Sequence, residues 1–390
     1  MKSARVIGAG LSGLSAAWCL ADAGWQVELI EAANEPGGLI HTHHTPEGLV
    51  ETAANAFVST DTTARWFERL GIPPVSPKPE SKKRYIFRDG RARRWPLTVF
   101  ETTSMAAHGG LAMLSRSTKA RPGETIETWG HRVVGKGATR WLIGAALQGI
   151  YATPPNRLSA EAIFSGRRKG KTRLATPAGG MGEFIARLHD GLVARGVHCT
   201  FSQRVMTLDA NTPTIIATNA AAAAALIAPH APALAQAVAG VEMRSISSVT
   251  AFFVKSSSDL HGFGVLFPRG CGVSALGVLF NDDTFPDRST LRSERWIYDL
   301  PIDDEPAAGQ LVAADRAVLT SRADKAIALH LTSWPNALPV YDHAILDVKA
   351  KLADRPPWLA LAGNYLGRLG VAALLEQAEE AASALKEPRG

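Results

Sequence analysis

A glycine-rich turn near the amino terminus constrains this chain more than any other feature. An apolar run enters Gly8-x-Gly10-x-x-Gly13, and a stretch with the composition of a good helix follows at once. Here Gly8 permits a tight turn, Gly10 lets the backbone approach a pyrophosphate, and Gly13 allows the helix to pack closely on the strand. The helix N-terminus offers unpaired N–H groups and a positive dipole to phosphates. The pattern predicts a strand–turn–helix that binds an adenine dinucleotide.

The next predicted strand, residues 26–31, ends in an acidic side chain. Glu31 follows the glycine turn at the spacing at which a carboxylate accepts a hydrogen bond from a ribose hydroxyl. A glycine triplet alone is also typical of an ordinary turn. Because strand, helix, second strand and terminal acid agree here, the dinucleotide interpretation is favoured.

Composition limits the remaining classes of function. The chain has 390 residues, of which 46% are hydrophobic, which is enough for a sizeable core and more than one domain. The net charge of +6 favours acidic partners, but no nucleic-acid-binding motif accompanies it, so no nucleic acid is expected as a partner. The cysteines lie far apart and form no C-x-x-C motif, which indicates a reducing compartment.

Two further observations bear on the location of the protein. The first predicted strand begins at once, so no signal peptide is expected. The alanine-rich stretch at 214–228 is too weakly hydrophobic to span a bilayer and reads as a strand followed by a capped helix. We expect a cytoplasmic protein, either free or at the inner face of the membrane.

Turn signals divide the chain into segments of different character. Residues 99–165 have mainly helical patterning, residues 177–228 are α/β, and residues 245–300 are rich in strands. After residue 341 the α/β character returns. This order predicts a dinucleotide domain that is interrupted by helical and strand-rich segments.

A second glycine-rich turn lies near the carboxyl terminus. Residues 358–362 read as a buried strand that opens into the stretch from Gly363 to Gly370, and a helix follows from about Val371. Such a turn can return to the first sheet and face the other end of a long ligand. A tightly held FAD would use both turns, whereas a nicotinamide dehydrogenase usually needs one. The same residues could equally form a flexible loop, and their spacing alone does not decide.

Several sequence blocks carry a family resemblance. They are Glu35-x-Gly37-Gly38 and the stretches at 149–164, 262–268, 276–280, 285–288, 334–341 and 361–367. Taken in order, they resemble the FAD-dependent protoporphyrinogen oxidases, which oxidise protoporphyrinogen IX or coproporphyrinogen III within the flavin amine oxidase superfamily. Their order is kept over most of the chain.

The resemblance implies a fold that is α/β in part and α+β overall. A Rossmann-like FAD-binding domain is expected from discontinuous segments, a β-sheet domain is expected to bind substrate, and a helical insert is expected to be able to contact a membrane. The corresponding ranges are 1–75, 177–232 and 342–390 for the FAD domain, 76–98 and 233–341 for the substrate domain, and 99–176 for the insert.

The resemblance also implies the reaction and the residues that bind the cofactor. The porphyrinogen, a tetrapyrrole with propionates, would lose electrons to the flavin in repeated cycles, and molecular oxygen would reoxidise the flavin. No side chain is given a catalytic role, because the cofactor does the chemistry. The expected cofactor-binding residues are Gly8, Gly10, Leu11, Ser12, Gly13, Glu31, Gly37, Gly38, Val205, Gly363, Gly370 and Val371. No metal ion is expected.

The resemblance suggests four residues for the substrate site. Phe263 and Leu266 match positions that hold the tetrapyrrole over the flavin, although both could be ordinary core residues. Arg84 matches an arginine that pairs with a propionate, and a guanidinium suits a carboxylate through its bidentate fork. His41 stands where an arginine follows the glycine pair in this branch.

Some positions depart from the family pattern. In residues 51–57 an alanine, Ala53, replaces a glycine near the flavin. The basic run at 167–173 reads as a solvated loop that could attract anionic substrate or lipid. Two alternatives therefore stay open beside the porphyrinogen oxidase. One is a related flavin oxidase or desaturase that acts on an amine or other metabolite, and the other is a non-catalytic flavin-binding protein. The oligomeric state and the choice between the two porphyrinogens stay open as well.

Overall fold

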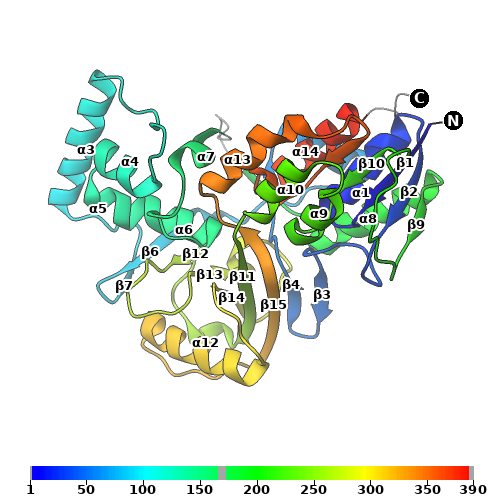
Figure 1. The fold of residues 1–390 in the computed structure, drawn as a ribbon. Helices are drawn as coiled ribbons and strands as arrows, with labels where there is room; N and C mark the ends of the chain where they lie inside the picture. Colours follow the sequence, from blue (N-terminus) through cyan, green and yellow to red (C-terminus); the bar gives the residue numbers. More distant parts are fainter. Residues whose placement is uncertain (1, 166–172, 386–390) are drawn as a thin grey trace.

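Two large β-sheets organise the part of the chain that the computed structural model describes, residues 2–165 and 173–385 (Figure 1). One sheet is parallel and lies near both termini, and the other is mixed and lies at the centre of the molecule. The expected mixture of α/β and antiparallel structure is confirmed. Most of the basic run at 167–173 lies outside the described residues.

The parallel sheet has five strands in the order β16-β10-β1-β2-β9. They are β1 (Ser3–Ile7), β2 (Gln26–Ile30), β9 (His198–Thr200), β10 (Thr214–Ile216) and β16 (Leu359–Leu361). Because β16 pairs with β10, which pairs with β1, the chain returns near its end to the sheet in which it began. This confirms the return to the first sheet that the second glycine-rich turn made possible.

Helices cover both faces of the parallel sheet, as buried parallel strands require. Alternate residues of β1 show the two faces, because Val6 belongs to one core and Ile7 to the other. On the Val6 side lie α1 (Leu11–Asp22), α2 (Asp61–Arg69), α8 (Met181–Ala194) and α14 (Val371–Ala384). On the Ile7 side lie α9 (Ala220–Ile227), α10 (Pro232–Ala239) and α13 (His343–Lys351).

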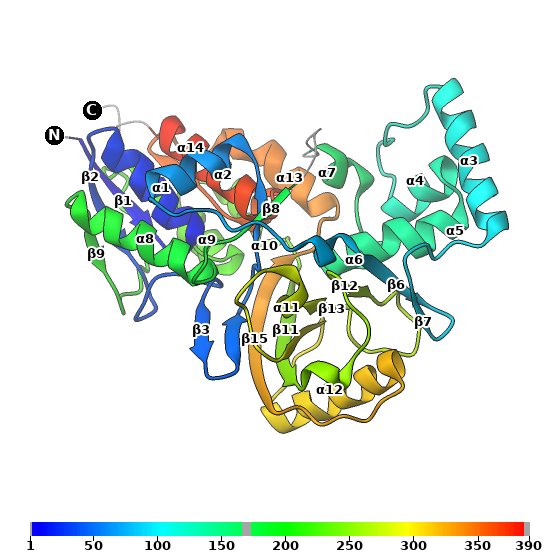
Figure 2. The ribbon, with the colours of Figure 1, turned by 180° about the vertical axis from the view of Figure 1, so that it is seen from behind.

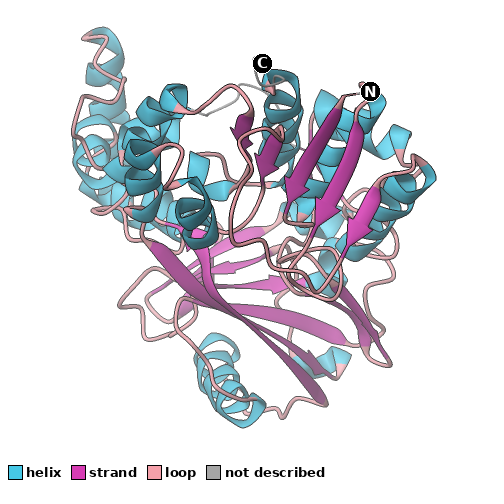
Figure 3. Cartoon of the chain, turned by 45° about the vertical axis from the view of Figure 1, so that its right-hand side comes forward, coloured by secondary structure: helices cyan, strands magenta, loops and turns pink. Residues whose placement is uncertain are grey.

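The mixed sheet has seven strands in the order β15-β11-β14-β13-β12-β6-β7. They are β6 (Arg84–Arg88), β7 (Arg91–Arg93), β11 (Met243–Phe253), β12 (Gly264–Leu266), β13 (Gly277–Phe280), β14 (Arg292–Tyr298) and β15 (Ala328–Pro339). Helix α12 (Glu305–Thr320) packs on one face through Val312, in a core that includes Val249 and Trp296. Figure 3 shows α12 on that side and the rest of the molecule on the other.

A helical segment projects from the side of the mixed sheet (Figures 1 and 2). It comprises α3 (Val99–Leu114), α4 (Ile126–Val133), α5 (Lys136–Ala138), a π-helical stretch (Thr139–Gly144), α6 (Ala145–Tyr151) and α7 (Ala160–Ser165). Thr98 caps α3, and Glu101 completes the capping box and also accepts a hydrogen bond from Arg88 of β6 at 2.6 Å. That contact ties α3 to the sheet. Among the described residues, no helix has both the length and the apolar character needed to cross a membrane.

Short elements complete the fold. They are the hairpin of β3 (Thr42–Thr45) and β4 (Gly48–Glu51), the pair of β5 (Phe57–Ser59) and β8 (Arg173–Ala175), α11 (Asn281–Thr284), and 3₁₀ turns at Pro79–Lys82, Lys255–Ser257, Leu352–Asp354 and Asn364–Leu366. Strand β8 falls within the range expected for the helical insert, yet it pairs with β5 from the first segment of the chain.

Candidate active site

The first glycine turn joins β1 to α1 through very close backbone contacts. A Cβ atom on Gly13 would lie 1.8 Å from the Gly8 carbonyl oxygen, and one on Gly8, at φ +102°, would lie 2.6 Å from the Ala217 carbonyl oxygen. At Gly10 the nearest atom to an added Cβ is the Cα of Gly38, at 3.9 Å. The fold therefore requires glycine at positions 8 and 13, whereas Gly10 keeps open space in front of α1.

The helix that follows this turn begins without a side-chain cap. Its N-cap is Gly10, and the N–H groups of its first turn, which includes Leu11 and Ser12, have no partner within the helix. Some other helices are capped by a side chain, as Thr60 caps α2 and Asp304 caps α12, whereas α8 and α10 are not. An uncapped start beside open space suits a phosphate group.

The second glycine pair lies directly against the first turn. The Gly37 N–H donates to the Ala9 carbonyl oxygen at 2.9 Å, and a Cβ on Gly38 would lie 3.2 Å from the Cα of Gly10. Both glycines have positive φ, +127° for Gly37 and +63° for Gly38. Side chains at these positions would be strained and would narrow the space beside Gly10.

Glu31 is fixed at the end of β2, next to the turn. Its carboxylate accepts hydrogen bonds from the Ala9 N–H at 2.6 Å and the Ala33 N–H at 2.8 Å. The Gln203 N–H donates to the Glu31 carbonyl oxygen at 2.9 Å, so the loop after β9 lies beside it. That loop carries Val205, which packs against the core on the Ile7 side of the sheet. Glu31 and Val205 thus lie at the same end of the sheet as the first turn.

The carboxyl-terminal turn leads from the carboxyl end of β16 into α14, at the same end of the parallel sheet as the first glycine turn. The Gly363 N–H donates to Oε1 of Gln377 at 2.7 Å, and a Cβ on Gly363 would lie 2.5 Å from the Tyr365 ring. Gly370, at φ +95°, is the N-cap of α14 and has no atom within 4 Å of an added Cβ, and Val371 begins the helix. Like α1, α14 has no side-chain cap. Two uncapped helices therefore start at the carboxyl ends of strands of one parallel sheet.

Residues 51–55 connect the parallel sheet to the mixed sheet. The Trp334 indole N–H donates to the Thr52 carbonyl oxygen at 3.0 Å, and the Asn55 amide donates to Asn281 at 3.0 Å. Ala53, which departs from the family pattern, lies in this connection. The face of the mixed sheet that lies away from α12 is thereby joined to the segment that follows the second glycine pair.

Glu51 is a buried acid that the sequence reasoning did not select. Its carboxylate accepts hydrogen bonds from Thr42 Oγ1 at 2.6 Å and from the Met181 N–H at 2.9 Å, and it pairs with Arg288 at 3.2 Å. Burial raises the pKa of Glu51 from its ordinary value, and the hydrogen bond from Thr42 and the charge of Arg288 oppose that rise. The Glu51 motif and Arg288 were both visible in the sequence, but their contact spans most of the chain.

The structure brings three of the four predicted substrate residues together. The Arg84 guanidinium lies over the Phe263 ring, 4.7 Å from its centroid. Strands β6 and β12 run side by side, so Leu266 lies two positions along from the same contact. A Cβ on Gly149 of α6 would lie 2.5 Å from Cδ2 of Leu266, so α6 packs closely against this side chain.

His41 lies apart from this group. A ring nitrogen of His41 is 3.1 Å from the Gly38 carbonyl oxygen, and the ring stacks on Trp334 with centroids 6.4 Å apart. Its neighbours are thus the second glycine pair and an edge strand of the mixed sheet. The structure places His41 with the predicted cofactor residues rather than with Arg84.

Comparison with known proteins identifies the family. The family model for flavin containing amine oxidoreductases matches residues 11–290. The chain belongs to this family. It is 27% identical to the coproporphyrinogen III oxidase of Mycobacterium tuberculosis, over 99% of this chain and 98% of that protein. It is 23% identical to the chloroplastic protoporphyrinogen oxidase of Nicotiana tabacum, over 97% of this chain and 84% of that protein.

Solved structures agree on the fold of this flavin-containing amine oxidoreductase. A provisionally assigned protoporphyrinogen oxidase from Exiguobacterium sp. 255-15 superposes with a TM-score of 0.81 at 17% identity, with 98% of each chain covered. A putrescine oxidase variant superposes with a TM-score of 0.74 at 15% identity, again with 98% of each chain covered. The protein is an FAD-dependent oxidoreductase, as predicted. The uncapped starts of α1 and α14 and the open space at Gly10 fit that cofactor.

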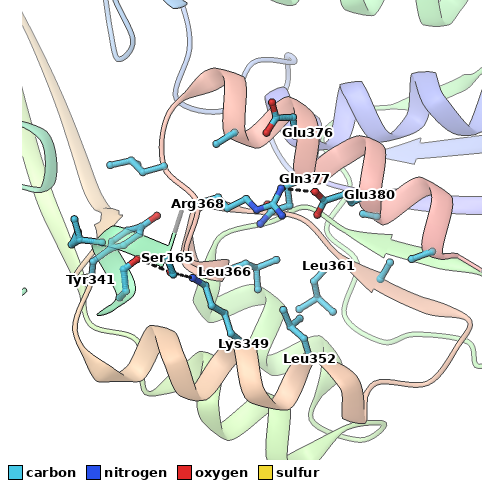
Figure 4. A pocket seen from close by; sticks show the side chains of 18 of the residues that line it. Ser165, Tyr341, Lys349, Leu352, Leu361, Leu366, Arg368, Glu376, Gln377 and Glu380 are labelled. Atoms are coloured by element: carbon cyan, nitrogen blue, oxygen red, sulfur yellow. Dashed lines mark hydrogen bonds and ion pairs between the residues drawn. The ribbon is translucent and has the colours of Figure 1, made fainter. Parts of the chain in front are cut away.

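A separate pocket of about 890 Å³ lies beside the edge strand β16, between α7, α13 and α14 (Figure 4). Lys349 reaches across it to Ser165 at 3.1 Å, and Arg368 pairs with Glu380 at 2.7 Å. Burial lowers the pKa of Lys349, and the charge of Arg368 adds to that effect. None of the residues of the first glycine turn lines this pocket, so it is not the predicted pyrophosphate site, although residues 366–369 of the second glycine-rich stretch do line it.

Proposed function

We propose that this flavoenzyme is a porphyrinogen oxidase of haem biosynthesis, which converts coproporphyrinogen III or protoporphyrinogen IX to the porphyrin with oxygen as acceptor. The observation that carries the proposal is the pairing of Arg84 with Phe263 beside Leu266. A guanidinium, an aromatic ring and an aliphatic side chain suit a broad, apolar substrate with carboxylates. An amine substrate is cationic and would be repelled by Arg84.

The residues named above would divide the cofactor between them. Gly8, Gly10, Leu11, Ser12 and Gly13 would hold the pyrophosphate, with Gly37 and Gly38 closing over it. Glu31 and Val205 would meet the ribose and adenine, while Gly363, Gly370 and Val371 would meet the flavin half. Bound FAD would supply the acceptor for a hydride from a methylene bridge of the porphyrinogen.

The side chains of this chain would then position the substrate. Arg84 would hold a propionate at the edge of the mixed sheet, and Phe263 and Leu266 would fix the plane of the macrocycle and exclude water. His41, which lies beside Gly38 and Trp334, would contact the substrate on the side of the second glycine pair. None of these residues needs to transfer a proton, which agrees with the lack of a recognisable acid–base pair in the sequence.

The direct test supplies the purified, FAD-loaded protein with coproporphyrinogen III, protoporphyrinogen IX, putrescine or cyclohexylamine in air. We expect porphyrin fluorescence and hydrogen peroxide from at least one porphyrinogen and neither signal from the amines. Oxidation of an amine alone would instead identify an amine oxidase. Flavin that no donor reduces under anaerobic conditions would point to a non-catalytic flavin-binding protein.

We also propose that the helical segment docks on an anionic membrane surface. Large apolar side chains are exposed along α3 and just before it; they are Trp95, Val99, Phe100, Leu111, Met113 and Leu114. Arginines lie close by in β7 and after it, at positions 91, 93 and 94. Exposed apolar groups beside cations suit insertion among anionic lipid headgroups.

A vesicle experiment tests this docking surface. Replacing Phe100 and Leu114 with serine is expected to weaken binding to phosphatidylserine-containing vesicles, measured by co-sedimentation, about a hundredfold or more, because each buried apolar side chain contributes roughly 1.5–3 kcal/mol. The matched control is Val193→Ser, which alters an exposed apolar residue on α8. Equal binding of the double variant and the control would refute the proposal.

A further inference from the structure

A buried arginine without a carboxylate partner lies in the middle of the mixed sheet. Arg295 of β14 is 3% exposed, and its Nε donates to Ser248 Oγ at 2.6 Å. No carboxylate in the described parts of the chain forms an ion pair with it. The other buried arginines of this half are all paired: Arg288 with Glu51 at 3.2 Å, Arg292 with Asp283 at 2.8 Å and Arg316 with Glu294 at 3.0 Å.

The register of the strands shows which way Arg295 points. Its neighbours in sequence, Glu294 and Trp296, lie on the face that packs against α12, so Arg295 lies on the opposite face. Its cross-strand partners are Thr250 on β11 and Leu279 on β13, both uncharged. This is the face that residues 51–55 hold toward the glycine turns.

The same row of paired residues leads from Arg295 to Arg84. Leu279 pairs with Gly264, and Gly264 pairs with Arg84, so both arginines lie on one face of the sheet. The row crosses three strand spacings, which separates the two Cα atoms by about 14 Å. Leu266 lies on this face as well, because it is two residues after Gly264 on β12. The predicted substrate residues thus share their surface with a second cation.

An unpaired guanidinium inside a protein is costly, because burial removes water that nothing replaces. That cost lowers the pKa of Arg295 to about 10, so it is still charged at neutral pH, and the charge of Glu51 opposes the shift. Glu51 is already bonded to Thr42, Met181 and Arg288, and it does not contact Arg295. A ligand with a negative group would therefore gain more at Arg295 than at a paired arginine.

We propose that Arg295 binds a second carboxylate of the substrate, and that the site therefore prefers a porphyrinogen with carboxylates on opposite edges of its ring. Coproporphyrinogen III carries a propionate on every pyrrole, whereas protoporphyrinogen IX carries them on neighbouring pyrroles only. Only the former presents carboxylates on opposite sides of its ring to the two arginines, which lie three strands apart on one sheet face. This inference rests on the proposed porphyrinogen oxidase function.

The test compares Arg295→Met, which keeps the volume but removes the charge, with Arg295→Lys. For Arg295→Met we expect the KM for coproporphyrinogen III to rise about tenfold or more, with a much smaller rise for protoporphyrinogen IX. Arg295→Lys should keep most of the affinity. Arg295→Met should also melt at or above the temperature of the native protein, because it removes an uncompensated charge. Arg322→Met, at an exposed pair, is the control.

Several outcomes would overturn the inference. A fall in melting temperature for Arg295→Met, with unchanged KM, would show a structural role. A changed flavin reduction potential with unchanged KM would place the anionic edge of the flavin, rather than substrate, at Arg295. An equal rise in KM for both porphyrinogens would contradict the proposal that Arg295 binds a carboxylate found only on coproporphyrinogen III.

Binding separates this inference from the proposed function. Coproporphyrin III, the stable tetracarboxylate, can be titrated into the FAD-loaded protein and followed by fluorescence quenching. Tight binding that weakens in Arg295→Met would support the inference even if no porphyrinogen were oxidised. Turnover of porphyrinogens with coproporphyrin binding that ignores Arg295 would contradict the inference while leaving the proposed function intact.

Discussion

A single methyl group at Gly13 is expected to abolish flavin binding and to destabilise the folded protein. In Gly13→Ala the new Cβ would lie 1.8 Å from the Gly8 carbonyl oxygen. That atom belongs to the backbone, so α1 must move away from β1, and the core on that side opens. We expect a loss of about 3 kcal/mol in the free energy of unfolding, the upper range for overpacking. Thermal melting of the apoprotein and the flavin absorbance of the purified protein measure both effects.

Gly10→Ala is the matched control that separates folding from cofactor binding. An added Cβ at Gly10 would lie 3.9 Å from its nearest neighbour, and φ at Gly10 is −73°, which alanine adopts freely. The apoprotein should therefore melt at the same temperature as the native apoprotein. The flavin content should still fall sharply, because the methyl group occupies the space meant for the pyrophosphate. Full flavin content in Gly10→Ala would contradict that placement.

The amino-terminal turn could be predicted from sequence because its physics is local. The glycines at 8, 10 and 13 and the acid at 31 are fixed by one strand–helix–strand unit, and the structure contains that unit. The return of β16 to the same sheet was one of two possibilities, because spacing alone could not decide whether Gly363 to Gly370 formed a turn or a flexible loop. The pairing of β16 with β10 is long-range, and no local pattern encodes it.

The mixed sheet was harder to predict, because its strands carry charges in the interior. Strand β14 begins at Arg292, and the charged residues at its start, Arg292 and Glu294, look in the sequence like part of a solvated edge. They are buried because Asp283 and Arg316, from other elements, neutralise them. β15 was not predicted either; it is a half-exposed edge strand with Pro335 inside it, a position that strands tolerate only at edges or bulges.

The candidate substrate residues show the same limit. The resemblance selected Arg84 and Phe263 separately, and only the parallel pairing of β6 with β12 brings them into contact. The same pattern gave no reason to select Arg295, because an arginine in a strand normally faces water. The role of Arg295 depends on the face of the sheet that it occupies and on its lack of a carboxylate partner among the described residues. Both are properties of the folded sheet.

The buried charges behind Arg295 lead to the second large effect. Glu294 is 0% exposed, and its two oxygens accept from Arg292 Nε at 3.3 Å and Arg316 Nε at 3.0 Å. Glu294→Gln keeps the shape but removes the charge that both guanidiniums share. Removing one partner of a buried pair leaves uncompensated charge and costs about 3–5 kcal/mol. Urea unfolding should show a much lower midpoint with an unchanged slope.

An exposed pair provides the comparison that makes this result specific. Asp259 pairs with Arg322 at 3.0 Å and is 92% exposed, so Asp259→Asn should change the free energy of unfolding by about 1 kcal/mol at most. If Glu294→Gln changed it equally little, then Asp283 and Asp324 would suffice for the two arginines. Because Glu294 lies on the face opposite Arg295, the variant should still bind FAD and coproporphyrin III well below its melting temperature. Loss of both ligands in the folded variant would mean that the network also sets the position of Arg295.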